Sequence, residues 1–186
     1  GSAIDFSDTT KFKFEIATST NGYIYDGWFE LFYLEEELST GSTTLESIRY
    51  PMFSNILSEP GAGPTALEIR FTNLDFYSGL SRNLEAAAPG IKRYFEHLEI
   101  QINGGGAELY LLYLNSIANT GLVQDFSTAQ YTNIDEGLGL FSSRREVRIE
   151  EVTLTPTSID TLACGQKTSH LGFAPSTLSP YYPDCQ

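Results

Sequence analysis

The sequence predicts a mainly β domain, an antiparallel β-sandwich or barrel with one packed amphipathic α-helix. Several segments alternate apolar and polar residues with the period of two that is typical of half-buried strands. Only one long segment spaces its apolar residues as a helix does. The chain has 186 residues, of which 41% are hydrophobic and 13% aromatic, so it can bury the core of one domain and is not a disordered chain.

The first predicted strand spans residues 11–19, where Phe12, Phe14 and Ile16 fall on one face. The Asn21-Gly22 pair that follows is a strong β-hairpin signal, so we expect this strand to pair with the next one along the chain.

The second predicted strand, residues 23–37, is apolar on both faces. One face carries Tyr23, Tyr25, Phe29, Leu31 and Tyr33, and the other carries Ile24, Trp28, Phe32 and Leu34. This pattern favours a central strand, or one that crosses from the core to a ligand surface. We expect Gly27 to mark a β-bulge in it.

The next segments also predict strands. Residues 39–44 form a predicted turn, and residues 45–53 a strand that Pro51 places near a sheet edge. Residues 58–65 are a loop by their glycine and proline content. Residues 66–76 alternate cleanly, with Leu67, Ile69 and Phe71 directed inward.

The predicted helix lies near residues 89–103. Pro89 suits its first turn, and three glycines at 104–106 end it. One apolar stripe at helical spacing is formed by Ile91, Tyr94, Phe95, Leu98 and Ile102. Residues 107–117 are compatible with either helix or strand. Two further strands are predicted at 126–134 and 145–156, and the core-facing residues of the second are Val147, Ile149 and, after a slip at Glu150-Glu151, Val152 and Leu154.

These segments predict one domain over residues 1–156 and a loop-like C-terminal tail over residues 157–186. The tail holds both cysteines, Cys164 and Cys185, whose spacing and context suit a disulfide that closes a loop; two unrelated free thiols are the alternative. Such a bond contributes roughly 3 kcal/mol in the chain-entropy model. It implies an oxidising, extracytoplasmic compartment.

The charge balance argues against nucleic acid as a partner, because a net charge of −13 repels phosphate backbones. The longest apolar stretches are far shorter than the ~20 residues of a membrane helix. The opening Gly1-Ser2 resembles an introduced junction, which leaves open whether a signal segment or lipid anchor was removed, so the absence of one here is weak evidence against secretion.

The Gly137-Leu138-Gly139 segment is not a phosphate-binding loop. The third glycine of a dinucleotide motif is replaced by Ser142, and no Gly-Lys-Ser/Thr ending follows. Asn133, Gly137 and Gly139 are therefore predicted to form a structural turn. Asp135 and Glu136 could ligate Ca²⁺ with Asn133, but the D-x-D-x-D-G loop is missing, so no metal and no cofactor are predicted.

No catalytic residues are predicted. His97 is expected on the solvated helix face, and His170 lies in the tail. There is no G-x-S-x-G or H-E-x-x-H motif, although carboxylates paired only in space remain open. The aromatic side chains are the better lead, because flat rings stack on sugars and other ligands. The ligand-binding candidates are Tyr23, Tyr25, Trp28 and Tyr33, and the alternative is that these rings fill the core.

Residues 92–154, from Lys92 to Leu154, combine an aromatic-rich segment containing Tyr94, Phe95 and Leu98 with a later motif at Tyr131, Asn133, Ile134, Gly137, Gly139 and Phe141. This combination resembles a known family, the domain-of-unknown-function lipoproteins of the Bacteroidetes cell envelope, in which the aromatic-rich segment is a helix. The resemblance implies export, a lipid anchor upstream of this chain, and a periplasmic or outer-membrane surface location. It supplies no catalytic residues.

We therefore expect a non-catalytic, extracytoplasmic domain of the cell envelope that binds a ligand or partner, for example a glycan or an envelope protein, with its specific activity left open. Contact with the membrane is expected only through the upstream lipid anchor. Two rival interpretations are a structural or assembly module of the cell surface and a hydrolase that uses paired carboxylates.

Overall fold

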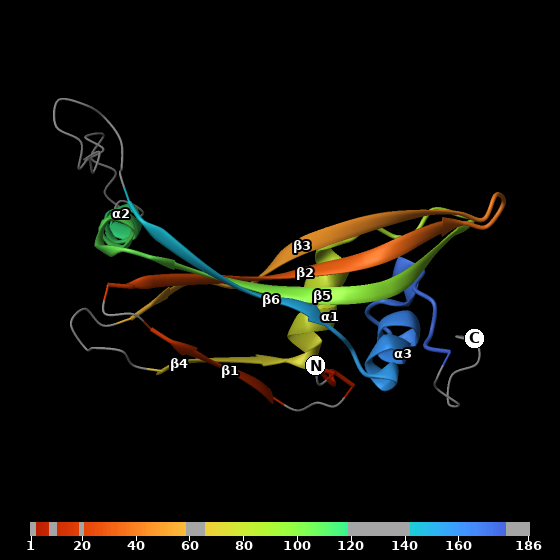
Figure 1. The fold of residues 1–186 in the computed structure, drawn as a ribbon, viewed down its shortest axis with the longest axis horizontal. Coiled ribbons are helices and arrows are strands. Elements are labelled where there is room, and N and C mark those ends of the chain that lie inside the picture. The colour runs from red at the N-terminus through yellow and green to blue at the C-terminus, as the bar shows by residue number, and fades with distance from the viewer. Residues whose placement is uncertain (1–2, 8–10, 19–20, 59–65, 119–141, 178–186) are drawn as a thin grey trace, which may run out of the picture.

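The protein is a mainly β molecule built from two antiparallel sheets, which Figure 1 shows as the layers of a β-sandwich. The structure, a computed structural model, describes residues 3–7, 11–18, 21–58, 66–118 and 142–177. The predicted fold class is confirmed, and the two sheets decide for a sandwich over a barrel.

The larger sheet has four strands, and the smaller one has two. The order in the larger sheet is β3 (Ser42–Leu57), β2 (Ile24–Glu37), β5 (Ile91–Gly105) and β6 (Arg144–Val152). The smaller sheet pairs β1 (Lys11–Ala17) with β4 (Ala66–Thr72). The described helices are α1 (Asn73–Asn83), α2 (Ala107–Ala118), α3 (Pro156–Cys164) and a short 3₁₀ helix, η1 (Ser169–Leu171).

The two faces of the larger sheet differ. The β1–β4 sheet, α1 and α3 all lie on one side of it, which we call the inner face (Figure 1). The core between these layers is rich in aromatic rings; its most deeply buried members include Phe6, Phe29, Leu31, Tyr50, Phe76, Leu80, Leu98, Ile100 and Leu162. We call the opposite side the outer face. None of the described helices is long and apolar enough to span a membrane.

Strand β2 is central, as predicted, and pairs with β3 and β5 along its length. The register of β2 against β3 shifts on both sides of Gly27, so an irregularity is present where a bulge in β2 was predicted, but the bulged strand is β3. The extra residues belong to β3, where Asn55 has a φ of 55°. A Cβ atom on Gly27 would overlap the ring of Phe53, so only glycine permits this ring to pack against the bulge.

The predicted hairpin at Asn21-Gly22 is wrong. Strand β1 pairs with β4, not with β2, so this dipeptide leads the chain from the smaller sheet to the larger one. The inward positions predicted for β4 are confirmed, because Ile69 and Phe71 are buried and Leu67 is half-buried.

The predicted helix at 89–103 is also wrong, because these residues form β5. The register of β2 against β5 shifts between Phe32 and Tyr33, which pair with His97 and Phe95, so Glu96 is an extra residue in β5. This bulge places Phe95 and Leu98 three residues apart on the same side of the sheet. Three-residue spacing across a bulge imitates one turn of a helix.

The helix that does pack on the core is α1, in the segment where a strand was expected to continue to residue 76. The Thr72 side chain accepts a hydrogen bond from the Asp75 N–H at 3.2 Å, and Asp75 Oδ2 accepts from the Thr72 N–H at 2.8 Å. This capping box ends β4 and begins α1. Phe76, Tyr77 and Leu80 then bury one side of the helix against the core.

Residues 157–177 are not the predicted loop-like tail. Thr155 caps α3, Pro156 occupies its first turn, and Leu162 is fully buried. Farther on, Phe173 forms a parallel bridge with Arg93 of β5. The described part of the tail therefore belongs to the same domain. Cys164 ends α3 and packs against the core, whereas Cys185 lies outside the described residues, so the disulfide between them stays a prediction.

Strand β6 confirms one expectation and corrects another. Its register slips between the pairs at Leu98 and Ile100, and Glu151 has a φ of 52°, as the slip at Glu150-Glu151 predicted. Val147 and Ile149 were expected in the core but are 52% and 45% exposed. The reason is the unequal size of the two sheets: β6 lies at the edge of the four-stranded sheet, and the facing sheet has only two strands to cover it.

Candidate functional site

The outer face of the larger sheet carries the single tryptophan of the chain. Pairing places Trp28 of β2 beside Pro51 of β3 and Gln101 of β5. The Trp28 side chain is half-buried, and Arg49 Cζ lies 4.7 Å from its ring centroid. Cation–π contacts at exposed sites contribute only ~0.5–1 kcal/mol, so an incoming ligand can displace Arg49 from the ring.

A hollow of about 670 Å³ lies over this part of the face. Its lining combines one aromatic ring with polar and charged side chains, and includes Trp28, Arg49, Gln101, Asn103, Arg144 and Glu146. A second hollow, of about 410 Å³, shares Asn103 and Arg144 with the first. It adds Asp26, Asn55, Tyr113 and Ser116. We call the two hollows together the outer groove.

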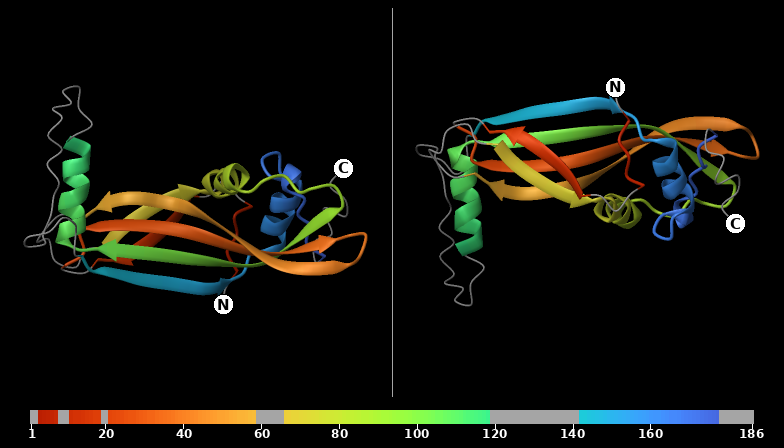
Figure 2. Two further views of the ribbon diagram at one scale, coloured as in Figure 1. Left: turned by 90° about the horizontal axis from the view of Figure 1, so that it is seen from above. Right: turned by 90° about the horizontal axis from the view of Figure 1, so that it is seen from below.

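Helix α2 forms the end wall of the outer groove. Figures 1 and 2 show it crossing one end of the larger sheet, on the side away from β1 and β4. The glycine that ends β5 allows this close approach: a Cβ atom on Gly105 would lie 2.8 Å from Leu109 and 2.9 Å from Ile24. Tyr113 and Ser116 of α2 therefore line the groove opposite the sheet.

The floor of the outer groove contains a buried polar group without a partner. Gln101 is 6% exposed, and its Nε2 donates a hydrogen bond of 3.4 Å to Asn103 Oδ1. Its Oε1 is buried and has no hydrogen-bond partner among the described residues. An unpaired buried acceptor costs about 1–3 kcal/mol, so a ligand that donates a hydrogen bond here removes a real penalty.

Charged groups lie in the second hollow, which Asp26 lines, and on β6, where Arg148 pairs with Gln101. Asp26 Oδ1 accepts from the Asn55 backbone N–H at 2.7 Å, which fixes that carboxylate at the groove. Arg148 bridges Glu99 at 3.1 Å and Glu146 at 3.3 Å, along the β5–β6 side. The groove thus offers an aromatic surface together with hydrogen-bond donors and acceptors at fixed positions.

The four candidates named from the sequence do not share one surface. Trp28 lines the outer groove, whereas Tyr25 and Tyr33 are directed inward and are each 5% exposed. Tyr23 is half-buried and lies beside Tyr110 of α2, with ring centroids 6.1 Å apart. Tyr33 packs on Phe173 in the core. Only Trp28 is placed to stack on a ligand at the outer face.

The histidines lie away from the outer groove. His97 is half-buried, not solvated as expected, and stacks on Phe32 with ring centroids 4.4 Å apart. His170 is exposed in η1. The described residues contain no group of three or more His, Cys, Asp or Glu that could hold a metal ion. Asn133, Gly137 and Gly139 lie outside the described residues, so the predicted turn stays a prediction.

Reading the sequence missed most of the groove. Gln101 and Asn103 were assigned to a helix, although the polar residues at 99, 101 and 103 alternate with Leu98, Ile100 and Ile102 as in a strand. That alternation was the available signal. Nothing in the sequence indicates that Arg49, which lies on a different strand, would stack on Trp28.

Comparisons with known proteins give no match: no family model fits the chain, no curated protein is similar in sequence, and no solved structure is similar in fold. The resemblance to the cell-envelope lipoproteins therefore stays a hypothesis. Its nine matched positions include Tyr94, Phe95 and Leu98, which lie in β5 and not in a helix.

Proposed function

We propose that this chain is a non-catalytic, extracytoplasmic domain that binds a glycan in the outer groove. The observation that carries the proposal is the pairing of the half-buried Trp28 ring with the buried, unpartnered Oε1 of Gln101 in one hollow. A sugar has an apolar face that stacks on an aromatic ring and hydroxyl groups that donate hydrogen bonds.

The remaining lining supports the same ligand class. Each hollow of the outer groove has one aromatic residue in its lining, Trp28 of β2 in the larger hollow and Tyr113 of α2 in the smaller one. Asn103 and Arg144 line both hollows. Two connected hollows suit an extended ligand of more than one sugar ring. Binding pockets for small ligands commonly measure about 300–1,000 Å³, and each hollow falls in this range.

A glycan array with the purified protein, followed by calorimetry on each positive glycan, tests this proposal. Trp28→Ala should lower the affinity at least about tenfold, which is ~1.4 kcal/mol. Phe32→Ala is the matched control, because Phe32 lies on the same face of β2 but stacks on His97, outside the groove. Equal effects of the two substitutions would contradict a role of Trp28 in binding.

Gln101→Leu separates binding from folding. The substitution removes an unpartnered buried acceptor, so the free energy of unfolding should stay the same or rise. The affinity for the glycan should nevertheless fall, because its hydrogen bond to Oε1 is lost. Release of shortened sugars from a bound glycan would instead support the hydrolase interpretation, with carboxylates of the groove such as Asp26 and Glu146 to be replaced next.

Export from the cytoplasm and a lipid anchor upstream of this chain are part of the same proposal, and the predicted Cys164–Cys185 bond supports them. Thermal unfolding with and without reductant tests the bond. Loss of a bond worth roughly 3 kcal/mol should lower the Tm by about 6–12 °C for a domain of this size. An unchanged Tm, with both thiols reactive in the untreated protein, would count against an oxidising compartment.

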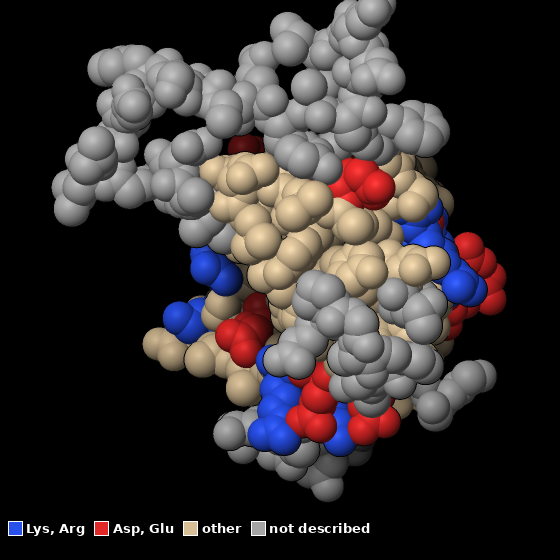
Figure 3. All heavy atoms as spheres, turned by 90° about the vertical axis from the view of Figure 1, so that its left-hand side faces the viewer, with Lys and Arg blue, Asp and Glu red and all other residues tan. Residues whose placement is uncertain are grey.

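An assembly module of the cell surface is the second candidate, and exposed leucines on α2 favour it. Leu111, Leu112 and Leu114 are 41%, 40% and 38% exposed. Figure 3 views the end of the molecule where α2 lies, and uncharged residues occupy much of its centre. If α2 docks on an envelope protein, Leu111→Asp should abolish that complex and leave glycan binding unchanged.

A further inference from the structure

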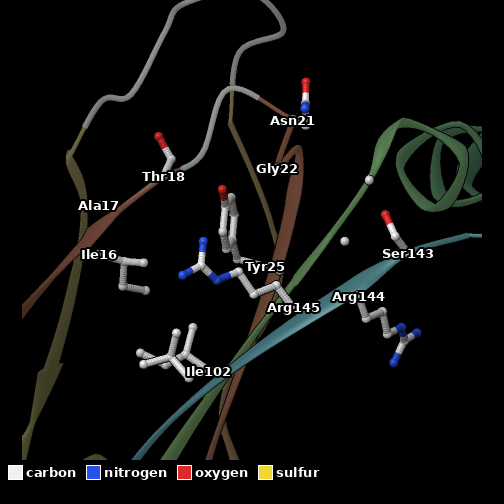
Figure 4. Close-up of a pocket in the computed structure, with 14 residues that line it drawn as sticks. Ile16, Ala17, Thr18, Asn21, Gly22, Tyr25, Ile102, Ser143, Arg144 and Arg145 are labelled. Atoms are coloured by element: carbon white, nitrogen blue, oxygen red, sulfur yellow. The ribbon is translucent and has the colours of Figure 1, made fainter.

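A second cavity, of about 440 Å³, lies at the α2 end of the sandwich. It opens on the inner side of the larger sheet, between β1 and the strands β2, β5 and β6, whereas the outer groove lies on the other side; Gly104, Gly105 and Arg144 border both. Figure 4 shows that its lining comes from the end of β1, the start of β2, the end of β5 and the start of β6.

The walls of this cavity are largely apolar. Ile16 of β1 and Ile102 of β5 line it from the two sheets, and Val147 of β6 contributes an aliphatic side chain that is 52% exposed. Tyr25 of β2 is also part of the lining and is 5% exposed. An aliphatic chain between the sheets would cover these side chains, including Val147, which the two-stranded sheet leaves exposed.

A cation lies at the cavity. Figure 4 shows the Arg145 side chain directed toward Tyr25, whereas the neighbouring Arg144 is directed to the other side of β6. Arg145 forms no ion pair with a carboxylate of the described residues. Arg93 and Arg148, by contrast, pair with Glu35 and with Glu99. Arg145 is exposed and no ion pair with a described residue holds its guanidinium, so this group is available to an anionic ligand in the cavity.

A buried hydroxyl adds a second polar group. The Tyr25 hydroxyl has no hydrogen-bond partner in the described part of the chain. A phenol donates one hydrogen bond and a carboxylate accepts several, so Tyr25 and Arg145 can serve the same carboxylate. Arginine binds carboxylates through paired, charge-assisted hydrogen bonds.

We infer that this cavity binds an aliphatic carboxylate, such as a fatty acid of medium chain length. The carboxylate contacts Arg145, and the chain lies between the sheets against Ile16, Ile102 and Val147. The negative charge of such a ligand matches the positive charge of Arg145, and its aliphatic chain matches the apolar walls of the cavity. The site lies on the opposite side of the larger sheet from the outer groove, and the inference does not depend on glycan binding.

Calorimetry with decanoate, decanol and acetate tests the inference. Decanoate should bind with one molecule per chain, acetate should not bind measurably, and decanol should bind at least about tenfold more weakly than decanoate. Arg145→Gln should lower the affinity for decanoate about tenfold, to that of decanol, and leave decanol binding unchanged. Arg82→Gln is the matched control, because it removes the same charge at the exposed end of α1.

Val147→Glu provides an independent variant. Because Val147 is half-exposed, the substitution should preserve the fold, and its carboxylate should repel decanoate from the cavity. The inference is overturned if decanoate does not bind saturably below its micelle concentration. It is equally overturned if Arg145→Gln leaves decanoate binding unchanged, or if acetate binds as tightly as decanoate.

Discussion

Arg93 connects the C-terminal part of the chain to the larger sheet, and replacing it gives the sharpest stability prediction. The residue is 7% exposed. Its Nε donates to Glu35 Oε1 at 2.7 Å, and its Nη1 donates to the carbonyl oxygens of Glu85 and Leu171 at 2.7 and 3.0 Å. Its guanidinium also lies 5.4 Å from the ring centroid of Tyr33.

Arg93→Met keeps an apolar stem of similar length but leaves three acceptors without their donor. Each of the two carbonyl oxygens loses its hydrogen-bond donor, which lowers the free energy of unfolding by about 1–3 kcal/mol. Glu35 is 28% exposed at its side chain, so water replaces part of its lost interaction and its contribution is smaller. The expected sum is about 3–5 kcal/mol, the range observed when one partner of a buried ion pair is removed.

Urea unfolding followed by circular dichroism measures this loss. If the free energy of unfolding falls by about 2 kcal/mol per M of urea, the expected loss lowers the midpoint of the urea transition by about 2 M. Arg93→Lys should be intermediate, because one ammonium cannot reach all three acceptors as the guanidinium does. Lys92→Met is the matched control at the next position of β5 and should change stability by less than about 0.5 kcal/mol. A loss below about 1 kcal/mol for Arg93→Met would refute the reasoning.

Three further substitutions test other parts of the fold by the same unfolding assay. Gly27→Ala should cost about 1–3 kcal/mol, because the added methyl group must displace Phe53; a neutral result would contradict the close packing at the bulge. Leu98→Ala, at a fully buried position, should cost about 2–5 kcal/mol, and less would mean that β5 is not central. The N–H of Thr72 donates to the Asp75 carboxylate and holds the pKa of that carboxyl below its usual value. The carboxylate therefore stabilises the fold fully above pH ~4, and less as the pH falls through the lowered pKa, so the destabilisation by Asp75→Asn should shrink between pH 5 and pH ~2. A destabilisation independent of pH would contradict that assignment.

Regular alternation made parts of the fold predictable from the sequence. The inward positions of β4 follow from its alternation, and the apolar residues on both faces of β2 indicated a central strand. An irregularity is present at Gly27 as expected, but its extra residues lie in β3 and not in β2. Strand β5 was mistaken for a helix because the extra residue Glu96 breaks its alternation in the middle. Helix α1 was missed, although Thr72 and Asp75 form a capping box that is visible in the sequence.

The outer groove was less predictable than the fold, because its residues come from four strands and a helix. Trp28 was named as a candidate from its place on β2, and it does line the groove. Gln101 and Arg49 join it only through the pairing of β5 and β3 with β2, and pairing partners are not encoded locally. The exposure of Val147 follows from the unequal size of the two sheets, which no local pattern predicts.

The single tryptophan allows the most direct test of the proposed glycan site. A ¹H–¹⁵N NMR spectrum has one indole N–H signal, that of Trp28, and it can be followed while a glycan from the array is added. Glycan binding in the outer groove predicts a saturable shift of this signal, with the same Kd as calorimetry. A glycan that binds by calorimetry but leaves the Trp28 signal unmoved would contradict binding in this groove.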